Sequence, residues 1–304
     1  MAGELTERQA HLALNSLTGV GPIGINCLLE AFKGDPRAIL GASRKALERA
    51  LGPRSDAAGD VVAWADRFSP EKEEAKMAGS GVDFILRGSA GFPRLLSEIH
   101  DPPVGLYRKG PFACSGPCVA IVGTRRATAY GMSIAKRLGS ELAQRGICVV
   151  SGLARGVDTA AHEGALSAAG RTVAILATGI DIVFPPENLA LYRKIAESGA
   201  VLSEFPFGRA ADKDSIPMRS RLISGMCEAV IVVESDRWGG AMTTARFAGE
   251  QGRLVFAVPG RIDQSTSSGT NQLIRDGAAM LTGVDDLLEE MQFLGARAAE
   301  PPGP

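Results

Sequence analysis

The chain lacks any long hydrophobic run. No apolar stretch reaches the roughly 18 to 20 residues that a membrane-spanning helix needs, and residues 1–21 have neither the basic start nor the apolar stretch of a signal peptide. With 304 residues, of which 45% are hydrophobic and 22% charged, the composition is that of a folded globular protein with room for two domains. We therefore expect a cytoplasmic protein that does not associate with a membrane.

Residue types that bind metals are also scarce. The chain has three histidines and an odd number of scattered cysteines, which are Cys27, Cys114, Cys118, Cys148 and Cys227. None of these cysteines forms a paired metal-ligand spacing with a histidine, so we predict reduced, mostly buried thiols and no metal site. Cys114 and Cys118 are close enough for a metal or redox pair, but no second pair of ligands accompanies them.

Neither charge of one sign nor aromatic side chains are abundant. The formal net charge is −1, and aromatic residues make up 5% of the chain. The first value excludes a protein coated in positive charge but leaves room for a local basic groove. The second argues against a broad base-stacking platform, so any nucleic-acid contact should rest mainly on phosphates and a few pockets.

Residues 5–68 contain only helical patterns. HLALNSL, INCLLEAF and KALERAL have the apolar spacing of amphipathic helices, and breaks rich in glycine and proline separate them. Residues 17–22 and the helix after them resemble a helix-hairpin-helix, whose glycine turn presents N–H groups to a nucleic-acid phosphate. Only Lys33 adds positive charge nearby, which favours a plain helical turn. Residues 70–80 predict one more helix, charged and with a solvated face.

From residue 82 onward, strand and helix patterns alternate. Apolar runs of strand length occupy residues 82–86, 104–107, 119–122, 147–150, 172–176, 200–203, 229–233 and 254–258. Because most of these runs are continuously apolar, both faces of the strands should be covered, as in a mostly parallel, doubly wound α/β sheet. We predict a helical domain at 1–70, an α/β domain at 71–292, and a disordered tail rich in Ala, Pro and Gly at 293–304.

Two of the predicted strands end in glycine and arginine. The run at 119–122 leads into Gly123, Thr124, Arg125 and Arg126, and the run at 147–150 leads into Gly152, Arg155 and Gly156. Parallel strands place such loops side by side, where glycine permits close backbone approach and arginine donates two hydrogen bonds to one phosphate. The pair predicts a phosphate-binding site. Neither a complete dinucleotide fingerprint nor a P-loop is present, so we expect no nucleotide cofactor.

A third basic region spans residues 203–227 and carries Arg209, Lys213, Arg219 and Arg221. We predict that Arg219 and Arg221 open a helix, where the helix dipole disfavours cations unless an anion is bound. This region therefore extends the predicted positive surface and favours a phosphate backbone as the ligand.

Asp158 and His162 lie four residues apart, on one side of a predicted helix. Such a pair can act as a catalytic acid and base. No Ser or Cys nucleophile is spaced to join it, and a helix-capping role is more common. We therefore predict no catalytic residue.

Five blocks of sequence follow one another between about residues 81 and 290: VAIVGTRRATAYG, VVSGLARGVDTAAHEGAL, TGIDIVFPPENLALYRKIAESGAVLSEFPFG, IPMRSRLISGM and VFAVPGRIDQSTSSGTNQLIRDGA. Together they resemble the DprA/Smf family of bacterial DNA-processing proteins. The resemblance implies a Rossmann-like core that binds single-stranded DNA as a homodimer, and a SAM-like helical domain before it. It also implies delivery of the strand to RecA during natural transformation.

The resemblance assigns roles to particular positions. It places DNA-binding residues at Gly123, Thr124, Arg125, Arg155, Lys213, Arg219 and Arg221, and in a further loop at Gly239, Gly240 and Thr243. That loop reads Arg-Trp-Gly-Gly-Ala-Met-Thr where the family usually has Lys-Ser-Gly-Ser-Leu-Ile-Thr. Ile216 replaces a phenylalanine and Ser220 an asparagine of the family, which puts base contacts there in doubt. Many members continue into a winged-helix domain, for which the residues after Met291 show no pattern.

Two other functions remain open. Nucleoside-monophosphate hydrolases of the lysine-decarboxylase-like type share the fold and carry Pro-Gly-Gly-x-Gly-Thr-x-x-Glu. The nearest stretch here, residues 238–246, lacks the third glycine and has Arg246 at the catalytic glutamate position, so no carboxylate stabilises an oxocarbenium ion. A scaffold that recruits a recombinase through its surface is the other alternative. We predict a binding protein for single-stranded DNA that is not an enzyme.

Overall fold

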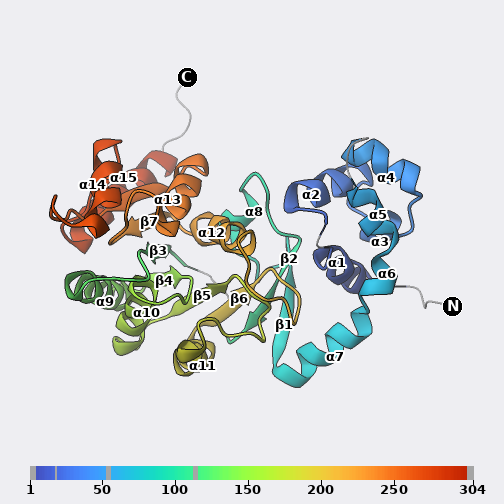
Figure 1. Cartoon of the computed structure of the whole chain (residues 1–304), viewed down its shortest axis with the longest axis horizontal. Helices are drawn as coiled ribbons and strands as arrows, with labels where there is room; N and C mark the ends of the chain where they lie inside the picture. Colours follow the sequence, from blue (N-terminus) through green and yellow to red (C-terminus); the bar gives the residue numbers. More distant parts are fainter. Residues whose placement is uncertain (1–4, 18, 53–55, 112–115, 300–304) are drawn as a thin grey trace.

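The computed structural model describes residues 5–17, 19–52, 56–111 and 116–299. Within these residues nine strands form one sheet in the order β1-β2-β6-β5-β4-β3-β7-β8-β9 (Figure 1). The strands are β1 (Val82–Leu86), β2 (Gly105–Lys109), β3 (Cys118–Val122), β4 (Cys148–Ser151), β5 (Thr172–Leu176), β6 (Ala200–Ser203), β7 (Ala229–Val232), β8 (Leu254–Ala257) and β9 (Ala279–Met280). Strands β3 to β9 are parallel, whereas β2 pairs antiparallel with both β1 and β6. The predicted Rossmann-like, mostly parallel sheet is confirmed.

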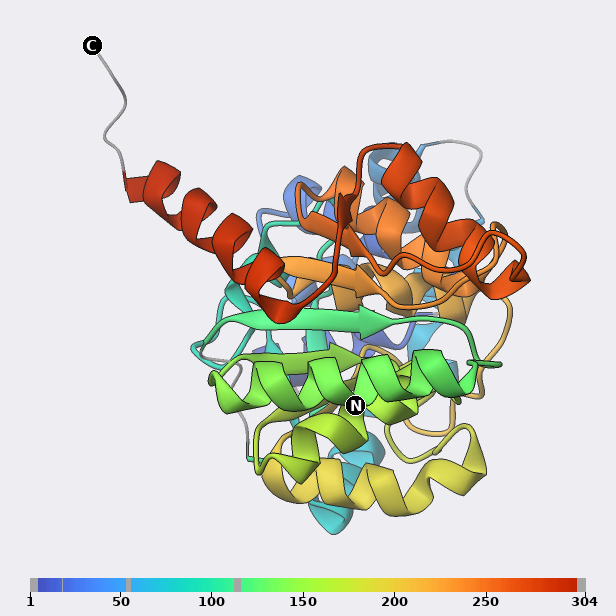
Figure 2. The ribbon, with the colours of Figure 1, turned by 90° about the vertical axis from the view of Figure 1, so that its left-hand side faces the viewer.

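Helices cover both faces of the parallel strands. After β1 the helices are α8 (Arg94–Ser97), α9 (Ala129–Gln144), α10 (Val157–Ser167), α11 (Leu189–Ser198), α12 (Ser215–Gly225), α13 (Gly240–Glu250), α14 (Ser268–Arg275) and α15 (Val284–Ala299). The apolar sides of α9, α10 and α15 pack on one face, and those of α12 and α13 on the other. Figure 2 shows α9 and α10 along the parallel strands. Because both faces are covered, β3 is buried throughout, which explains its unbroken apolar run.

The order of the strands reverses at β3. Strands β4, β5 and β6 follow on one side of it, and β7, β8 and β9 on the other. The chain leaves β3 for a helix on one face and leaves β7 for a helix on the opposite face. The loops after these two neighbouring strands therefore diverge and leave a crevice at the carboxyl edge, which is the topological switch point of the sheet.

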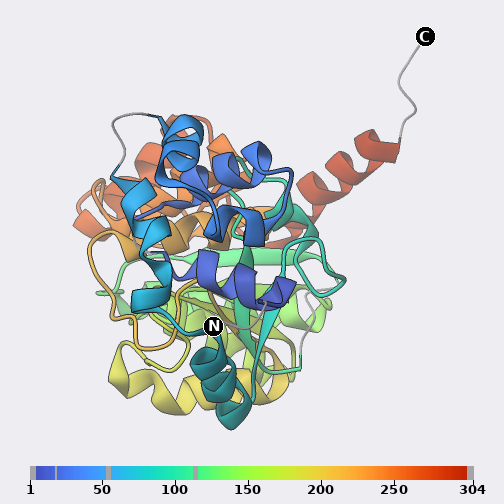
Figure 3. The same cartoon turned by 90° about the vertical axis from the view of Figure 1, so that its right-hand side faces the viewer.

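The N-terminal region is helical, as predicted. It contains α1 (Glu7–Asn15), α2 (Pro22–Ala31), α3 (Pro36–Leu40), α4 (Arg44–Leu51), α5 (Ala57–Val62), α6 (Trp64–Arg67) and α7 (Pro70–Ser80). Figures 1 and 3 show this module at the end of the molecule beyond β1 and β2. The side-chain amide of Asn15 donates to the carbonyl oxygen of Glu204 at 2.6 Å, which ties the module to the α/β part. Thr18, in the predicted hairpin, lies outside the described residues.

Helix α7 is less solvated than the charge run at residues 70–80 predicts. Glu73 is 3% exposed, and its Oε1 accepts hydrogen bonds from the hydroxyl of Tyr107 at 3.0 Å and from the N–H of Phe207 at 2.9 Å. Burial and the Glu73 carboxylate raise the pKa of Tyr107 well above its usual value. The charge run therefore contains one carboxylate that links α7 to β2 and to the loop after β6. The predicted boundary at residue 70 stays a prediction.

The C-terminal helix is longer than predicted. Helix α15 continues to Ala299, so residues 293–299 are helical and their assignment to a disordered tail is corrected. Alanine and arginine favour helix, which explains the extension of a pattern that we ended at residue 292. Figure 2 shows the end of α15 projecting away from the sheet. Residues 300–304 lie outside the described residues.

Most of the described cysteines are buried, as predicted. Cys118, Cys148 and Cys227 are buried, and Cys27 is exposed. Cys114 lies outside the described residues, so its suggested pairing with Cys118 stays a prediction. In the described part of the chain, no helix is both long and apolar enough to cross a bilayer.

The contact between α9 and α10 generates a stability prediction. A Cβ at Gly164 of α10 would lie 2.1 Å from the carbonyl oxygen of Lys136 in α9, whereas a Cβ at Gly249 of α13 would meet no atom within 4 Å. We expect Gly164→Ala to lower the free energy of unfolding by about 1–3 kcal/mol, because the helices must move apart. Gly249→Ala should leave it unchanged or raise it by up to about 1 kcal/mol. Urea denaturation of both variants checks this, and equal effects would contradict it.

Candidate nucleic-acid interface

The loop between β3 and α9 is held against the loop between β7 and α13. The N–H of Thr124 donates to the carbonyl oxygen of Glu234 at 2.7 Å. The carboxylate of Glu234, which is 3% exposed, accepts from the hydroxyl of Thr128 at 2.5 Å and from its N–H at 2.9 Å. Thr128 in turn caps α9 by accepting from the N–H of Gly131 at 3.1 Å. These bonds fix the geometry of the crevice at the switch point, where open α/β sheets bind ligands.

A cavity of about 480 Å³ occupies this crevice on the side of α12 and α13. The predicted site residues in its wall are Gly123, Thr124, Arg125, Arg126, Arg219, Gly239 and Gly240. The first turn of α13, from Gly240, is also part of the wall, and no side chain caps it. Unpaired N–H groups and the positive end of the helix dipole suit an anion.

Arg219 forms a buried positive part of the cavity wall. Its side chain is 7% exposed, and Nη1 donates to the carbonyl oxygen of Ile175 at 3.1 Å. Its Nε has no hydrogen-bond partner among the described residues. Burial lowers the pKa of Arg219, the charge of Asp158 opposes this shift, and the charge of Arg125 adds to it. An anion in the cavity would stabilise this guanidinium, because a buried cation with an unpaired N–H is costly.

Two of the predicted glycines shape the site through their neighbours. A Cβ at Gly152 would lie 1.3 Å from Nη1 of Arg219, so only glycine leaves room for that guanidinium. Gly156 has a φ of +76°, and a Cβ there would lie 2.4 Å from the carbonyl oxygen of Thr124. Gly156 therefore lets the loop after β4 pack closely on the loop after β3. Direct contact of either glycine with a ligand stays a prediction.

A smaller cavity of about 50 Å³ adjoins the first. The two cavities share Arg125, Ala154, Ile216 and Arg219, and the smaller one adds Gly152, Arg155 and the exposed ring of Phe184. We call the two adjoining cavities together the arginine groove and define it by Arg125, Arg126, Arg155 and Arg219. Both predicted arginine loops thus contribute to one surface, as the parallel strands led us to expect.

Arg155 is partly neutralised in the free protein. Its Nε donates to Oε1 of Glu187, which lies in the 3-10 helix η1 (Pro186–Asn188). The carboxylate raises the pKa of Arg155, and the guanidinium lowers the pKa of Glu187. Both side chains are about half exposed, so a phosphate can compete with Glu187 for Arg155.

Asp158 and His162 have separate partners. Oδ2 of Asp158 accepts from the N–H groups of Gly152 at 3.1 Å and Ala154 at 3.3 Å, which shapes the loop after β4. Nδ1 of His162 lies 2.7 Å from the hydroxyl of Thr172. That hydroxyl donates its proton to a backbone carbonyl, so Nδ1 carries the imidazole proton and donates. Both side chains support the loop and helix, and they do not form a catalytic pair.

His162 gives the fold a dependence on pH. Burial and the charge of Arg219 lower the pKa of His162 to about 3, compared with about 6.5 in an unfolded chain. The unfolded state therefore binds more protons between these values, and the contribution of the neutral imidazole, complete above pH 6.5, is lost as the pH falls toward 3. Between pH 6.5 and 5 this loss amounts to about 2 kcal/mol.

We expect the free energy of unfolding of His162→Gln to fall less steeply over this interval than that of the parent protein. Urea denaturation at pH 6.5 and at pH 5 measures the difference between the two slopes. Parallel slopes would contradict the assignment of a buried neutral imidazole.

The position of Arg221 differs from the one that the sequence predicts. Helix α12 begins at Ser215, so Arg219 and Arg221 lie inside the helix and do not open it. Residues two apart project to nearly opposite sides of a helix. Arg221 is 2% exposed, and its guanidinium donates to the Glu204 carboxylate at 2.6 Å and pairs with Asp101 at 3.2 Å. These carboxylates neutralise Arg221, which is not among the residues that line either cavity, and its predicted contact with phosphate stays a prediction.

Other predicted positions are displaced from the groove or lie at its margin. Thr244 lines the larger cavity in place of Thr243, because it shares one face of α13 with Gly240 and Ala241. Lys213 is exposed in the loop before α12, outside the residues given for either cavity wall, and its contact with DNA stays a prediction. Arg209, on the same loop, is paired with Asp212 at 2.6 Å.

Sequence reasoning missed several wall residues, namely Ala154, Phe184, Asp236 and Thr244. Phe184 lies in one of the quoted family blocks, but nothing in the sequence assigned it a role, and no quoted block contains Asp236. Arg246, at the position of the hydrolase glutamate, is exposed on α13 and pairs with Glu250 at 2.7 Å. Arg246 lies two residues from Thr244 and on another side of the helix, so it does not face the groove. The position of the hydrolase carboxylate is therefore occupied by a cation that points elsewhere.

The fold and the groove define a Rossmann-like protein whose switch point is lined by arginines. Residues 83–292 match the model of the family described as DNA recombination-mediator protein A. Protein Smf of Synechocystis is 33% identical over 94% of this chain and 73% of its own length. DNA processing protein DprA of Bacillus subtilis is 39% identical over 73% of this chain and 75% of its own length.

Two solved structures extend the comparison. The structure of DprA from Streptococcus pneumoniae superposes with a TM-score of 0.80 at 30% identity, over 94% of this chain and 98% of that one. The structure of DNA processing protein A from Helicobacter pylori, solved to explain its single-stranded DNA binding mode, gives 0.63 at 30% identity over 69% and 95%. The chain therefore belongs to the DprA/Smf family of DNA recombination-mediator proteins.

Proposed function

We propose that the arginine groove binds the phosphate backbone of single-stranded DNA and performs no chemistry on it. The observation that carries this proposal is the pair of adjoining cavities that share Arg125 and Arg219. A single phosphate would fill only one of them, whereas a strand can place successive phosphates along both. The single-stranded DNA binding of the Helicobacter pylori relative supports the same ligand.

The groove has the charge that such a ligand requires. Arg125 and Arg126 are exposed, Arg155 can be released from Glu187, and Arg219 adds a buried charge from the wall. Asp158 and Asp236 reduce the positive charge of the larger cavity but do not cancel it. No cofactor enters this mechanism, because the cations and the first turn of α13 supply the whole anion site.

We extend the proposal to the partners of the strand-bound protein. Membership of a recombination-mediator family supports delivery of the bound strand to RecA during natural transformation, by a homodimer. A mobility-shift series with single- and double-stranded DNA of equal length, with protein mass in solution recorded in parallel, tests both the ligand and the dimer.

Removing two groove cations should weaken binding and its dependence on salt. We expect Arg125→Ala with Arg155→Ala to lower the affinity for a single-stranded oligonucleotide on the order of tenfold or more at low salt. The slope of log K against log salt should decrease by about 1.4, because each phosphate neutralised on a single strand contributes about 0.7 to the slope. Fluorescence anisotropy over a salt series measures both quantities.

The matched control removes two exposed, ion-paired arginines outside the groove. Arg94 and Arg246 pair with Glu98 and Glu250 and are 77% and 60% exposed. Arg94→Ala with Arg246→Ala changes the net charge equally and should leave the salt slope near that of the parent. If the two double variants bind equally well, the groove is not the DNA site.

Glu187 should act as a competitor of the phosphate. We expect Glu187→Gln to raise the affinity about two- to fivefold at low salt, because Arg155 no longer exchanges a carboxylate for the phosphate. The gain should disappear in the Arg155→Ala background. Anisotropy titration of the two single variants and the double variant measures this coupling, and a gain that persists without Arg155 contradicts it.

A further inference from the structure

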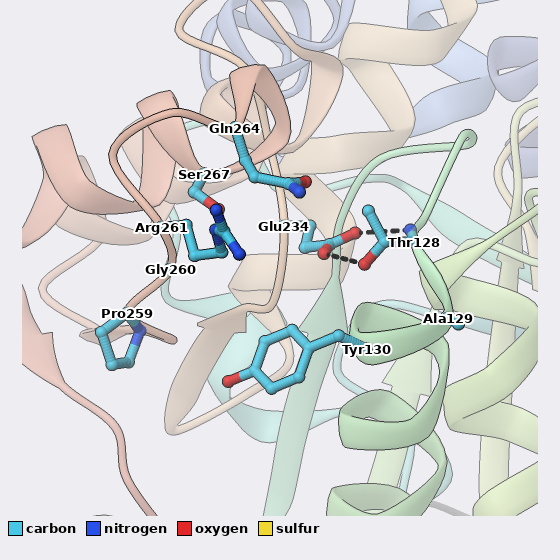
Figure 4. A pocket seen from close by; sticks show the side chains of 9 residues that line it. All are labelled: Thr128, Ala129, Tyr130, Glu234, Pro259, Gly260, Arg261, Gln264 and Ser267. Atoms are coloured by element: carbon cyan, nitrogen blue, oxygen red, sulfur yellow. Dashed lines mark hydrogen bonds between the residues drawn. The ribbon is translucent and has the colours of Figure 1, made fainter.

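A third cavity, separate from the two of the arginine groove, lies on the other side of the β3–α9 loop. It has a volume of about 700 Å³ and lies between the start of α9 and the loop after β8 (Figure 4). Tyr130 contributes an aromatic ring that is 52% exposed, and Pro259 lies near it. Gln264 approaches from the opposite side. We call this space the tyrosine cavity and define it by Tyr130, Pro259, Arg261 and Gln264.

The charged groups of the tyrosine cavity are already paired. The Arg261 guanidinium makes two hydrogen bonds to the Asp263 carboxylate, at 2.9 and 2.6 Å. The Glu234 carboxylate accepts two hydrogen bonds from Thr128 and so occupies the start of α9 (Figure 4). Among the residues that line this cavity, the charge of Arg261 is offset by the buried Glu234 carboxylate, so a phosphate finds no net positive charge here. The cavity therefore suits an uncharged planar group.

The lining offers such a group both stacking and recognition. The half-exposed ring of Tyr130 presents a π-face, on which any nucleobase can stack. The side-chain amide of Gln264 is exposed, and no hydrogen bond to it is recorded among the described residues. An amide of this kind can donate to and accept from the edge of a base.

The position of the cavity links it to the groove. Thr124 to Arg126 line the arginine groove, and Thr128 to Tyr130 line the tyrosine cavity, so one short loop separates the two spaces. The loop after β7 makes the same division, because Glu234 faces the tyrosine cavity and Asp236 faces the groove. A strand whose phosphates lie on Arg125 and Arg126 therefore has a base within reach of Tyr130.

We infer that the tyrosine cavity is a nucleobase subsite, in which one base of the bound strand leaves the stack and lies on the ring of Tyr130. This inference rests on the proposed function and adds to it a base contact on the other side of the β3–α9 loop from the groove. The low aromatic content of the chain is compatible with it, because the subsite needs one ring and no platform.

The experiment combines a protein variant with a modified strand. Anisotropy titrations compare the parent, Tyr130→Ala and Tyr130→Phe on an oligothymidylate and on an abasic oligodeoxyribose phosphate of equal length. We expect Tyr130→Ala to bind the oligothymidylate at least about fivefold more weakly than the parent, whereas Tyr130→Phe, which keeps the ring, binds normally. On the abasic strand all three proteins should bind equally.

Each outcome discriminates between the claims. The nucleobase subsite is overturned if Tyr130→Ala binds oligothymidylate as tightly as the parent does. It is also overturned if Tyr130→Ala loses as much affinity for the abasic strand as for oligothymidylate. The parent titration reports separately on the proposed function, since a parent that binds neither strand overturns that function together with the subsite. Thermal unfolding of Tyr130→Ala confirms that the variant is folded, as expected for an exposed side chain in the first turn of α9.

A fluorescent base provides an independent readout. Strands with a single 2-aminopurine should show fluorescence quenched by the parent at one position of the register, with the quenching lost in Tyr130→Ala and kept in Tyr130→Phe. Identical fluorescence with all three proteins at every position overturns the inference, because no base then stacks on the ring.

Discussion

The contact of Glu234 with the β3–α9 loop is the constraint on which the rest of the site depends. The carbonyl oxygen of Glu234 accepts a hydrogen bond from Thr124, and its buried carboxylate accepts hydrogen bonds from Thr128. These bonds join two loops that leave the sheet toward opposite faces. A Cβ at Gly131 would lie 2.4 Å from this carboxylate, which shows how closely α9 approaches it. Because Thr124 and Thr128 are both held by Glu234, the backbone of the Arg125–Arg126 segment between them has a fixed position.

The same contact divides the carboxyl edge into two chemically different spaces. On one side lie the arginines and the uncapped start of α13, which suit phosphate. On the other side the Glu234 carboxylate occupies the start of α9 and offsets the charge of Arg261, which favours an uncharged ring. One loop can thus present a backbone site and a base site to the same strand without either competing for the other's ligand.

Helix α12 illustrates how the fold assigns different tasks to similar residues. Arg219 reaches beneath Gly152 into the groove and keeps an unpaired Nε, whereas Arg221 reaches Glu204 and Asp101. A buried guanidinium that lost those two carboxylates would be strongly destabilising, so Arg221 is structural. The two roles follow from the helical rotation between residues two apart, together with what each side chain meets.

The sequence by itself determined the architecture. The apolar runs placed β5 and β6 at their observed residues, and their continuity implied a parallel sheet covered on both faces, because strands buried twice cannot alternate with polar residues. It also placed Arg125 and Arg155 at one edge, since parallel strands end side by side. The tertiary structure alone decided which cations face that edge. Ion pairs hold Arg221 away from the groove and join Arg155 to Glu187, and the fold brings Tyr130 and Pro259 into the wall of one cavity. These arrangements join segments too far apart in the chain for any local pattern to encode.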